Sequence, residues 1–174
     1  MKARCALGIW AEPRAALSSA MAPPLDPTID LVIRRARAAD LPEIARLLRL
    51  WIDAAWDFLV KHTPEEDLHH VEKSSRLGPI WLAVEAGRIV DVCTARRGWI
   101  DHLFVAPDRH GRGIGGALLA RALAGRSRVR LWTFQRNTRT RRFYALQGFR
   151  EVLTTDGRDN EEREPDVLLE WRRS

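Results

Sequence analysis

The chain has 174 residues, enough for one domain with a substantial core, and its 45% hydrophobic and 30% charged residues are typical of a globular protein. This composition argues against a membrane protein and against a disordered chain. The net charge of +6 indicates an anionic partner, which nucleic acid or a phosphorylated cofactor would satisfy. The two cysteines, Cys5 and Cys93, form no disulfide or metal-binding pattern, so a reducing, cytoplasmic location is expected.

Residues 1–30 are expected to be a flexible extension that precedes one folded domain at 31–174. The basic and apolar start resembles an export signal, but Glu12, Pro13 and Arg14 interrupt its apolar run. The proline-rich segment 21–30 is typical of an extended linker. A natural start at Met21 therefore remains an alternative.

The first elements of the domain are a strand and two helices. A β-rich run at 31–33 predicts the strand, and Asp40 is expected to cap a helix whose apolar residues recur at helical spacing as far as Leu59. A second capping box begins at Thr63 and predicts a helix to about residue 72. Three predicted strands follow, at 80–85, 88–95 and 99–105, as an antiparallel meander.

The second half alternates helices and strands. Its predicted elements are a helix at 114–123, a strand at 129–134, a helix at 138–147 and strands at 149–154 and 167–171. Gly125 and Gly148 are expected to end the two helices. The order β-α-α-β-β-β-α-β-α-β-β predicts an α/β fold: a mixed, largely antiparallel central sheet of about seven strands with helices on both faces.

A glycine-rich loop precedes the helix at 114–123. Its sequence, Gly111-Arg112-Gly113-Ile114-Gly115-Gly116, satisfies the dinucleotide pattern G-x-G-x-x-G. Such a loop normally follows the first strand and precedes an acid by about twenty residues, and neither condition holds here. Arg136 leaves an NADP-type site as an alternative, whereas a Walker loop is excluded because no Gly-Lys-Ser/Thr follows. A helix start of this kind binds phosphate through its N–H groups and dipole.

Three motifs resemble those of the GNAT family of N-acetyltransferases. The segment VAPDRHGRGIGGALL resembles the family's acetyl-CoA signature Q/R-x-x-G-x-G/A, with His110 in the first position. Residues 137–149 are similar to its segment N-x-x-A-x-x-F-Y-x-x-x-G-F, with Thr140 in place of the alanine. Residues 33–41 resemble its first strand and helix. The motifs occur in the family's order over about residues 31–172, which implies the GNAT fold.

The resemblance implies direct acetyl transfer from acetyl-CoA to a primary amine of a small molecule or protein. It assigns the diphosphate to the backbone of the glycine loop, and the pantetheine arm to the strand before it. Asn137 resembles a residue that contacts this arm, although a helix N-cap is an equal alternative. The predicted acetyl-CoA site contains Phe104, Val105, His110, Gly111, Arg112, Gly113, Ile114, Gly115, Gly116 and Asn137.

Two catalytic residues are predicted. Tyr144 matches the family's tyrosine, which protonates the departing thiolate. The family's acid on the fourth strand falls on Trp99, so Asp101, two residues further, is predicted as the base or water-orienting group because alternate strand residues share a face. His102, on the opposite face, is the second candidate. A backbone N–H near Val105 is expected to stabilise the oxyanion.

Other features leave alternatives open. His62, Glu66, His69 and His70 are explained as helix-surface residues, so no metal is expected. Two other function classes remain: a non-catalytic coenzyme A sensor, and a nucleic-acid-binding module that uses the arginines of residues 136–142. The acidic segment 160–164 would attract a cationic amine, or is a plain polar loop. No membrane partner is expected, and a homodimer is possible.

Overall fold

The computed structural model describes residues 31–55, 63–106, 109–160 and 162–173. The predicted extension at 1–30 and Leu59 lie outside the described residues. The helices are η1 (Ala38–Asp40, a 3-10 turn), α1 (Leu41–Ala55), α2 (Pro64–Leu77), α3 (Ile114–Leu123) and α4 (Thr138–Leu146). The strands are β1 (Leu31–Arg35), β2 (Ile80–Glu85), β3 (Arg88–Arg96), β4 (Trp99–Val105), β5 (Arg128–Phe134), β6 (Arg150–Thr154) and β7 (Asp166–Arg172).

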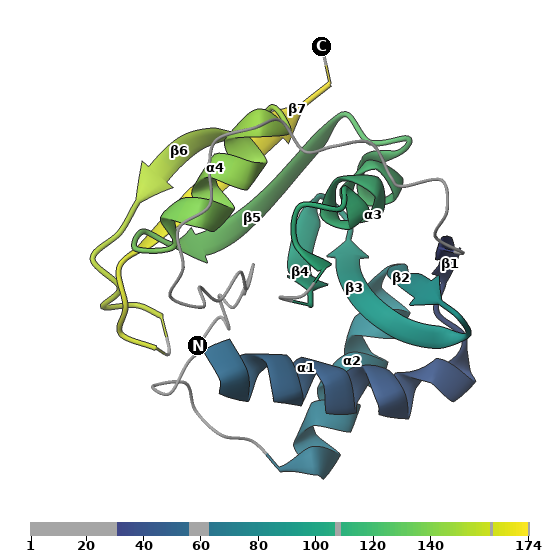
Figure 1. The fold of residues 1–174 in the computed structure, drawn as a ribbon. Coiled ribbons are helices and arrows are strands. Elements are labelled where there is room, and N and C mark those ends of the chain that lie inside the picture. Colours follow the sequence, from purple (N-terminus) through teal and green to yellow (C-terminus); the bar gives the residue numbers. More distant parts are fainter. Residues whose placement is uncertain (1–30, 56–62, 107–108, 161, 174) are drawn as a thin grey trace.

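The strands form one seven-stranded sheet in the order β1-β2-β3-β4-β5-β7-β6. Every neighbouring pair is antiparallel except β4 and β5, which are parallel. Helices α1 and α2 lie to one side of the sheet, and α3 and α4 to the other (Figure 1). The predicted fold class is therefore confirmed.

Two apolar layers hold the helices on the sheet. The layer under α3 and α4 includes the buried side chains of Ile114, Leu118 and Tyr144. The layer under α1 and α2 includes Ile44 and Val71, packed with apolar residues of β2, β3 and β4. Because successive strand residues point to opposite faces, the strands β2, β3, β4 and β5 contribute to both layers.

Two predicted helix boundaries are wrong. Helix α2 begins with the predicted capping box, in which Thr63 and Glu66 bond each other's backbone N–H, but it extends to Leu77 rather than residue 72. Asp40 does not cap α1 directly. It ends the turn η1, and its carboxylate accepts the Arg37 N–H at 2.6 Å and the Arg34 guanidinium at 2.7 and 2.8 Å.

We expect Asp40→Asn to destabilise the fold at neutral pH. The hydrogen bond from Arg34 lowers the pKa of Asp40 to about 2 from its ordinary 3.8. A carboxyl whose pKa is depressed in the folded state stabilises it by about 1–2 kcal/mol above pH 4, and this contribution is lost as the pH falls toward 2. Urea unfolding at pH 7 should show that loss for Asp40→Asn, and the difference from wild type should vanish near pH 2. Glu43→Gln, which removes an exposed ion pair with Arg46, should change stability by less than about 0.5 kcal/mol.

The centre of the sheet opens between β4 and β5. Their ladder consists of a single pair, Trp99 with Arg130. Beyond this pair the two strands diverge toward their carboxyl ends (Figure 1). One edge of β4 therefore has backbone groups that no strand pairs with over the described residues.

Candidate functional site

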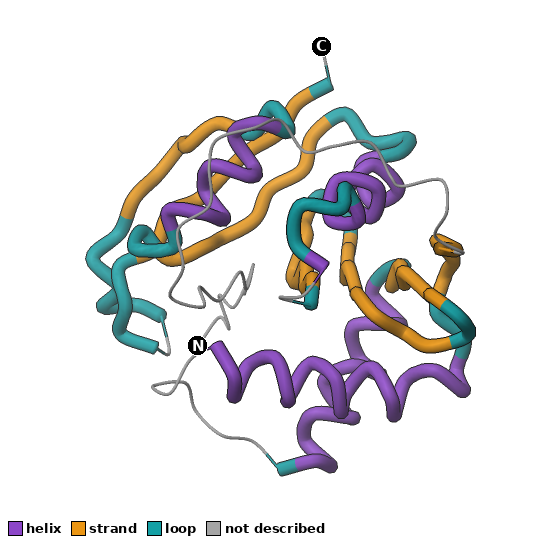
Figure 2. The backbone as a smooth tube through the Cα atoms, viewed as in Figure 1, coloured by secondary structure: helices purple, strands orange, loops and turns teal. Residues whose placement is uncertain are grey.

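The glycine loop joins the end of β4 to the start of α3 (Figure 2). Gly111 and Gly113 have φ angles of 82° and 79°, which glycine adopts without steric cost. Gly113 is the N-cap of α3 and supplies no side-chain cap. The first N–H groups of a helix have no intrahelical partner, so the backbone from Ile114 to Gly116 can donate to an anion.

Gly115 allows α3 to approach the sheet closely. A Cβ atom at this position would lie 3.3 Å from Cγ2 of Val105 and 3.5 Å from Cζ of Phe143. Because Gly115 has no side chain, the start of α3 packs directly against both β4 and α4. This contact places the free N–H groups beside the opening between β4 and β5.

His110 links the loop to β4. Its Nε2 atom lies 2.8 Å from the Val105 carbonyl oxygen. A carbonyl only accepts, so Nε2 carries the hydrogen and donates it. This nitrogen is thus engaged with the backbone of β4.

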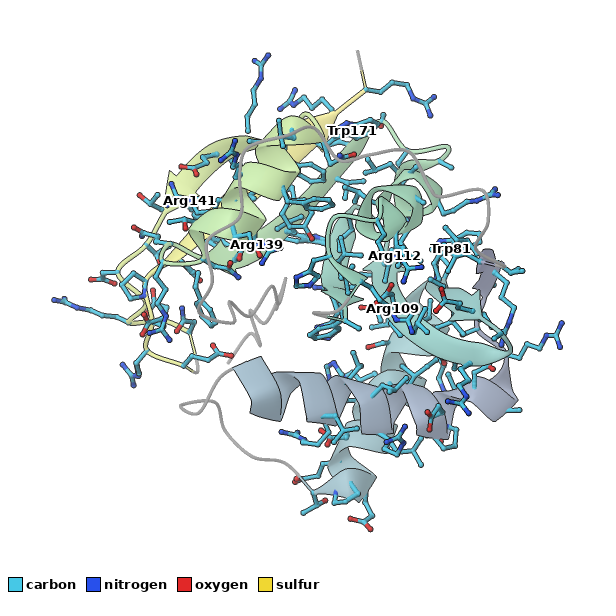
Figure 3. The ribbon with its side chains drawn as sticks, viewed as in Figure 1. Trp81, Arg109, Arg112, Arg139, Arg141 and Trp171 are labelled. Atoms are coloured by element: carbon cyan, nitrogen blue, oxygen red, sulfur yellow. The ribbon has the colours of Figure 1, made fainter. Side chains whose placement is uncertain are left out.

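Glu85, at the end of β2, binds two arginines of the loop region. Its carboxylate pairs with Arg109 and, at 3.2 Å, with Arg112 (Figure 3). The hydrogen bond from Arg109 is the main reason that the pKa of Glu85 lies below its ordinary value. Sequence reasoning missed Glu85, because nothing local marks an acid that meets its partners 24 and 27 residues later.

Tyr144 lies on α4 inside the apolar layer, with 1% of its surface exposed. Its ring packs edge-on against Phe143 and Phe149, with 5.1 Å between centroids in each pair. Burial raises the pKa of Tyr144 well above its ordinary value of 10. The hydroxyl group therefore keeps its proton at neutral pH, as a proton donor must.

Asn137 is the N-cap of α4. Its side-chain oxygen accepts the Thr140 N–H at 3.2 Å. Thr140 itself is fully buried at the position where the resembling motif has alanine. Of the two predicted roles of Asn137, the structure shows the helix cap.

Asp101 is the extra residue of a β-bulge. Thr94 pairs with His102 and Ala95 pairs with Ile100, which leaves Asp101 without a partner residue across the strands. The predicted alternation is therefore wrong here: Ile100 and Leu103 both enter the layer under α3 and α4, although strict alternation would separate them. A bulge re-aims side chains beside it, and this one lies where β4 begins to leave β5.

Arg96 holds Asp101 in place. Its Nε atom lies 2.8 and 3.0 Å from the two carboxylate oxygens, and its guanidinium lies 5.8 Å from the ring centroid of Trp99. Burial raises the pKa of Asp101, while the hydrogen bond from Arg96 and the charge of His70 oppose this shift. The carboxylate is thus a partly buried negative charge at the opening.

His102 contacts a second histidine that the sequence placed on the helix surface. Its Nε2 atom lies 3.3 Å from Nε2 of His70, which α2 carries. The His102 ring also stacks on Phe104, with centroids 5.6 Å apart. Burial lowers the pKa of His102 to about 3, so its ring is neutral at physiological pH.

Asp91 supports the end of β4 from the neighbouring strand. Its side chain is fully buried, and one oxygen accepts the Ala106 N–H at 2.7 Å. This residue was also missed by sequence reasoning. The available signal was an acid inside the apolar run of 89–93, where an unpaired carboxylate would be costly.

The arginines proposed for nucleic-acid binding are engaged within the protein. Arg136 pairs with Glu164 at 3.2 Å and Arg141 pairs with Glu151 at 2.7 Å. Both contacts reduce the charge available to a polyanion. In the described parts of the chain, no group of three metal-ligating side chains occurs, and no helix has the length and apolar character needed to cross a membrane.

Comparisons with known proteins find the same domain and the same fold. Residues 76–151, which run from the end of α2 to β6 and include the glycine loop, match the family model described as an acetyltransferase (GNAT) domain. Over these residues the chain is similar to the GNAT acetyltransferases. This finding confirms the family and the acetyltransferase activity that the sequence motifs implied.

Several members of the family are similar in sequence or structure. A peptidyl-lysine N-acetyltransferase, YjaB of Salmonella typhimurium, is 29% identical over 119 residues, which cover 68% of this chain and 82% of that protein. The solution structure of apo YjaB from Escherichia coli has a TM-score of 0.63 at 25% identity and covers 81% of this chain and 97% of its own. YncA from Salmonella typhimurium, solved with acetyl-CoA, has the same fold, with a TM-score of 0.67 at 18% identity over 82% of this chain and 94% of its own.

Proposed function

We propose that this GNAT domain transfers an acetyl group from acetyl-CoA directly to a primary amine. The observation that supports this most strongly is the position of the N-terminus of α3, packed by Gly115 beside the diverging strands β4 and β5. A diphosphate donor bound at the helix start would extend its arm into the opening. The relative solved with acetyl-CoA has the same fold.

The donor would be held mainly by backbone groups. N–H groups at the start of α3 would bind the diphosphate, where the helix dipole favours negative charge. The edge of β4 that faces the opening, at Phe104 and Val105, would bind the amide groups of the pantetheine arm as a neighbouring strand does. In this arrangement His110 fixes the Val105 carbonyl and the loop together.

The transfer needs two proton movements. The amine nitrogen attacks the acetyl carbonyl carbon, and the carbon–sulfur bond then breaks. A backbone N–H near Val105 would stabilise the oxyanion between these events. Tyr144 would give its hydroxyl proton to the leaving sulfur, and Asp101 would attract the ammonium group and act as its base or orient a water molecule.

A cationic amine is the acceptor class best supported by the charges. Asp101 lies at the opening, and the loop between β6 and β7 carries Glu162 as well as Glu164, which pairs with Arg136. This loop is held by Asn160, whose amide bonds the Glu164 carbonyl at 2.7 Å and Asp166 at 3.1 Å. The name of the YjaB relative adds a lysine side chain as one candidate.

Amine-dependent release of coenzyme A tests the proposed function. The purified chain would be incubated with acetyl-CoA and a panel of primary amines: a diamine, a free amino acid and a lysine-containing peptide. Thiol release that requires one of these amines, with acetylated amine found by mass spectrometry, is the expected result. Binding of acetyl-CoA without turnover on any amine would favour the coenzyme A sensor instead.

Location and assembly are further parts of this proposal. Cys93 is a buried free thiol, which supports a reducing, cytoplasmic location.

Strand β6 lies at the end of the sheet with all five residues exposed, including Val152 and Leu153 at 49% and 51%. An exposed edge of this kind can pair with a second copy, so a homodimer through β6 is proposed, and sedimentation measurements would detect it.

A further inference from the structure

Five arginines lie on one face of the sheet, at the end where β4 and β5 begin. One row of cross-strand partners runs over five strands and consists of Arg150, Glu170, Arg130, Trp99 and Arg96. The next row pairs Arg128 with Arg172. Residues opposite each other on neighbouring strands share a face. The residues between them, such as Val129 and Leu169, enter the layer under α3 and α4, so the arginines lie on the other face (Figure 1). We call the five arginines and Trp99 the arginine face.

Three members of the arginine face share one carboxylate. The Nε atoms of Arg128 and Arg130 lie 2.7 and 2.6 Å from one oxygen of Glu170. The Nε atom of Arg172 lies 2.6 Å from the other oxygen. The Glu170 side chain is 6% exposed, whereas those of the three arginines are 45%, 33% and 69% exposed. The single negative charge therefore lies beneath the guanidinium groups, and the face that solvent meets is positive.

The other two arginines add to this charge. Arg150 is exposed on β6, directly opposite Glu170. Arg96 pairs with Asp101 at 2.8 Å. The five guanidinium groups thus face two carboxylates, which leaves a surplus of three positive charges. The arginines of α4 differ, because Arg136 and Arg141 each pair with a carboxylate of their own.

An aromatic ring lies within this row of charges. Trp99 stands between Arg96 and Arg130, is half-buried, and has the Arg96 guanidinium 5.8 Å from its ring centroid. Guanidinium groups match the geometry of phosphate, and an aromatic ring beside arginines is a platform on which bases stack. An acidic peptide would satisfy the charges but would leave the ring without a role. We infer that the arginine face binds single-stranded nucleic acid, with phosphates on the arginines and a base on Trp99.

The arginine face is separate from the proposed donor site. Trp99 begins β4, whereas the glycine loop follows Val105 at its other end. Six residue steps along a strand span about 20 Å. The row from β3 to β6 crosses four strand spacings, or about 19 Å, which corresponds to roughly five stacked nucleotides at 3.4 Å each. A nucleic-acid strand on this face would therefore leave the glycine loop accessible, and the inference goes beyond the proposed acetyl transfer.

Fluorescence anisotropy with labelled single strands of about 20 nucleotides, one DNA and one RNA, tests this inference without any turnover. We expect dissociation constants of about 1–100 μM at low salt, the range of non-specific binding. Three phosphate contacts on a single strand give a slope of about −2 for log affinity against log salt, so affinity should fall about 10- to 20-fold between 50 and 200 mM salt. Saturating acetyl-CoA should not displace either strand.

The double variant Arg128→Gln/Arg172→Gln locates the site. Glu170 keeps its hydrogen bond from Arg130, so the fold and the acetyl-CoA-induced thermal shift should be retained. Loss of two phosphate contacts should weaken binding by about 10- to 30-fold at 0.1 M salt and reduce the salt slope by about 1.4. Arg139→Gln/Arg142→Gln, on α4 at the opposite face, carries the same charge change and should bind like wild type.

A third variant separates stacking from charge. Trp99→Leu should weaken binding by about fivefold or more with an unchanged salt slope, because base stacking involves no counterion. Wild-type affinity in Arg128→Gln/Arg172→Gln, or an equal loss in the α4 control, would overturn the inference. So would absence of binding at 50 mM salt, or displacement of the strand by acetyl-CoA. Equal competition by a polyglutamate peptide of the same charge would assign the arginine face to an acidic protein segment instead.

Discussion

Tyr144→Phe is expected to reduce kcat by about 10²–10⁴-fold, the range for general acid catalysis. The substitution removes the one hydroxyl group proposed to protonate the leaving sulfur. It retains the ring that packs against Phe143 and Phe149, so stability and acetyl-CoA affinity should stay close to wild type. Steady-state kinetics with a saturating amine would measure the effect.

The raised pKa of Tyr144 gives a second expectation for the same residue. Because burial keeps the hydroxyl protonated beyond pH 10, wild-type activity should not fall between pH 8 and 10 through loss of this proton. A Tyr144→Phe enzyme with wild-type kcat would remove Tyr144 from the mechanism. An unchanged kcat combined with weaker acetyl-CoA binding would assign it a binding role.

Gly113→Asp is expected to weaken acetyl-CoA binding by about 10²–10³-fold. The new carboxylate would stand at the N-cap of α3, where the donor's diphosphate is proposed to bind, and two like charges about 4 Å apart near a protein surface repel by about 4 kcal/mol. Isothermal titration calorimetry would measure the loss. Asparagine and aspartate tolerate the left-handed backbone and cap helices well, so the fold should be retained.

Gly113→Asn is the matched control for this prediction. It has nearly the same shape and the same backbone strain at φ 79°, but no charge. We expect a loss of affinity of about tenfold or less, caused by the added side chain alone. Equal losses for the two variants would indicate a steric effect and would argue against a diphosphate at the start of α3.

The local parts of the fold and site were predictable from sequence. Capping at Thr63, the β-meander and the glycine loop before α3 each depend on residues close together in the chain. The motif around Tyr144 is equally local. Periodicity and turn chemistry carry this information directly, and the order of the elements then restricted the sheet to one family of topologies.

The parts that sequence reasoning missed depend on contacts between distant segments. The bulge that leaves Asp101 unpaired arises from the register of β3 with β4, which alternation within one strand cannot reveal. Glu85 meets Arg109 only after the sheet has formed. His70 was read as a surface residue because its partner, His102, lies 32 residues later.

A thermal-shift titration with acetyl-CoA, coenzyme A and NADPH tests the central claim most directly. A ligand at a hundredfold excess over its dissociation constant stabilises the native state by about 2.7 kcal/mol, which raises the midpoint by roughly 5–10 °C in a chain of this size. Both coenzyme A forms should produce this shift, and NADPH should produce none. No shift with either coenzyme A form would contradict the assignment of the glycine loop to the acetyl donor.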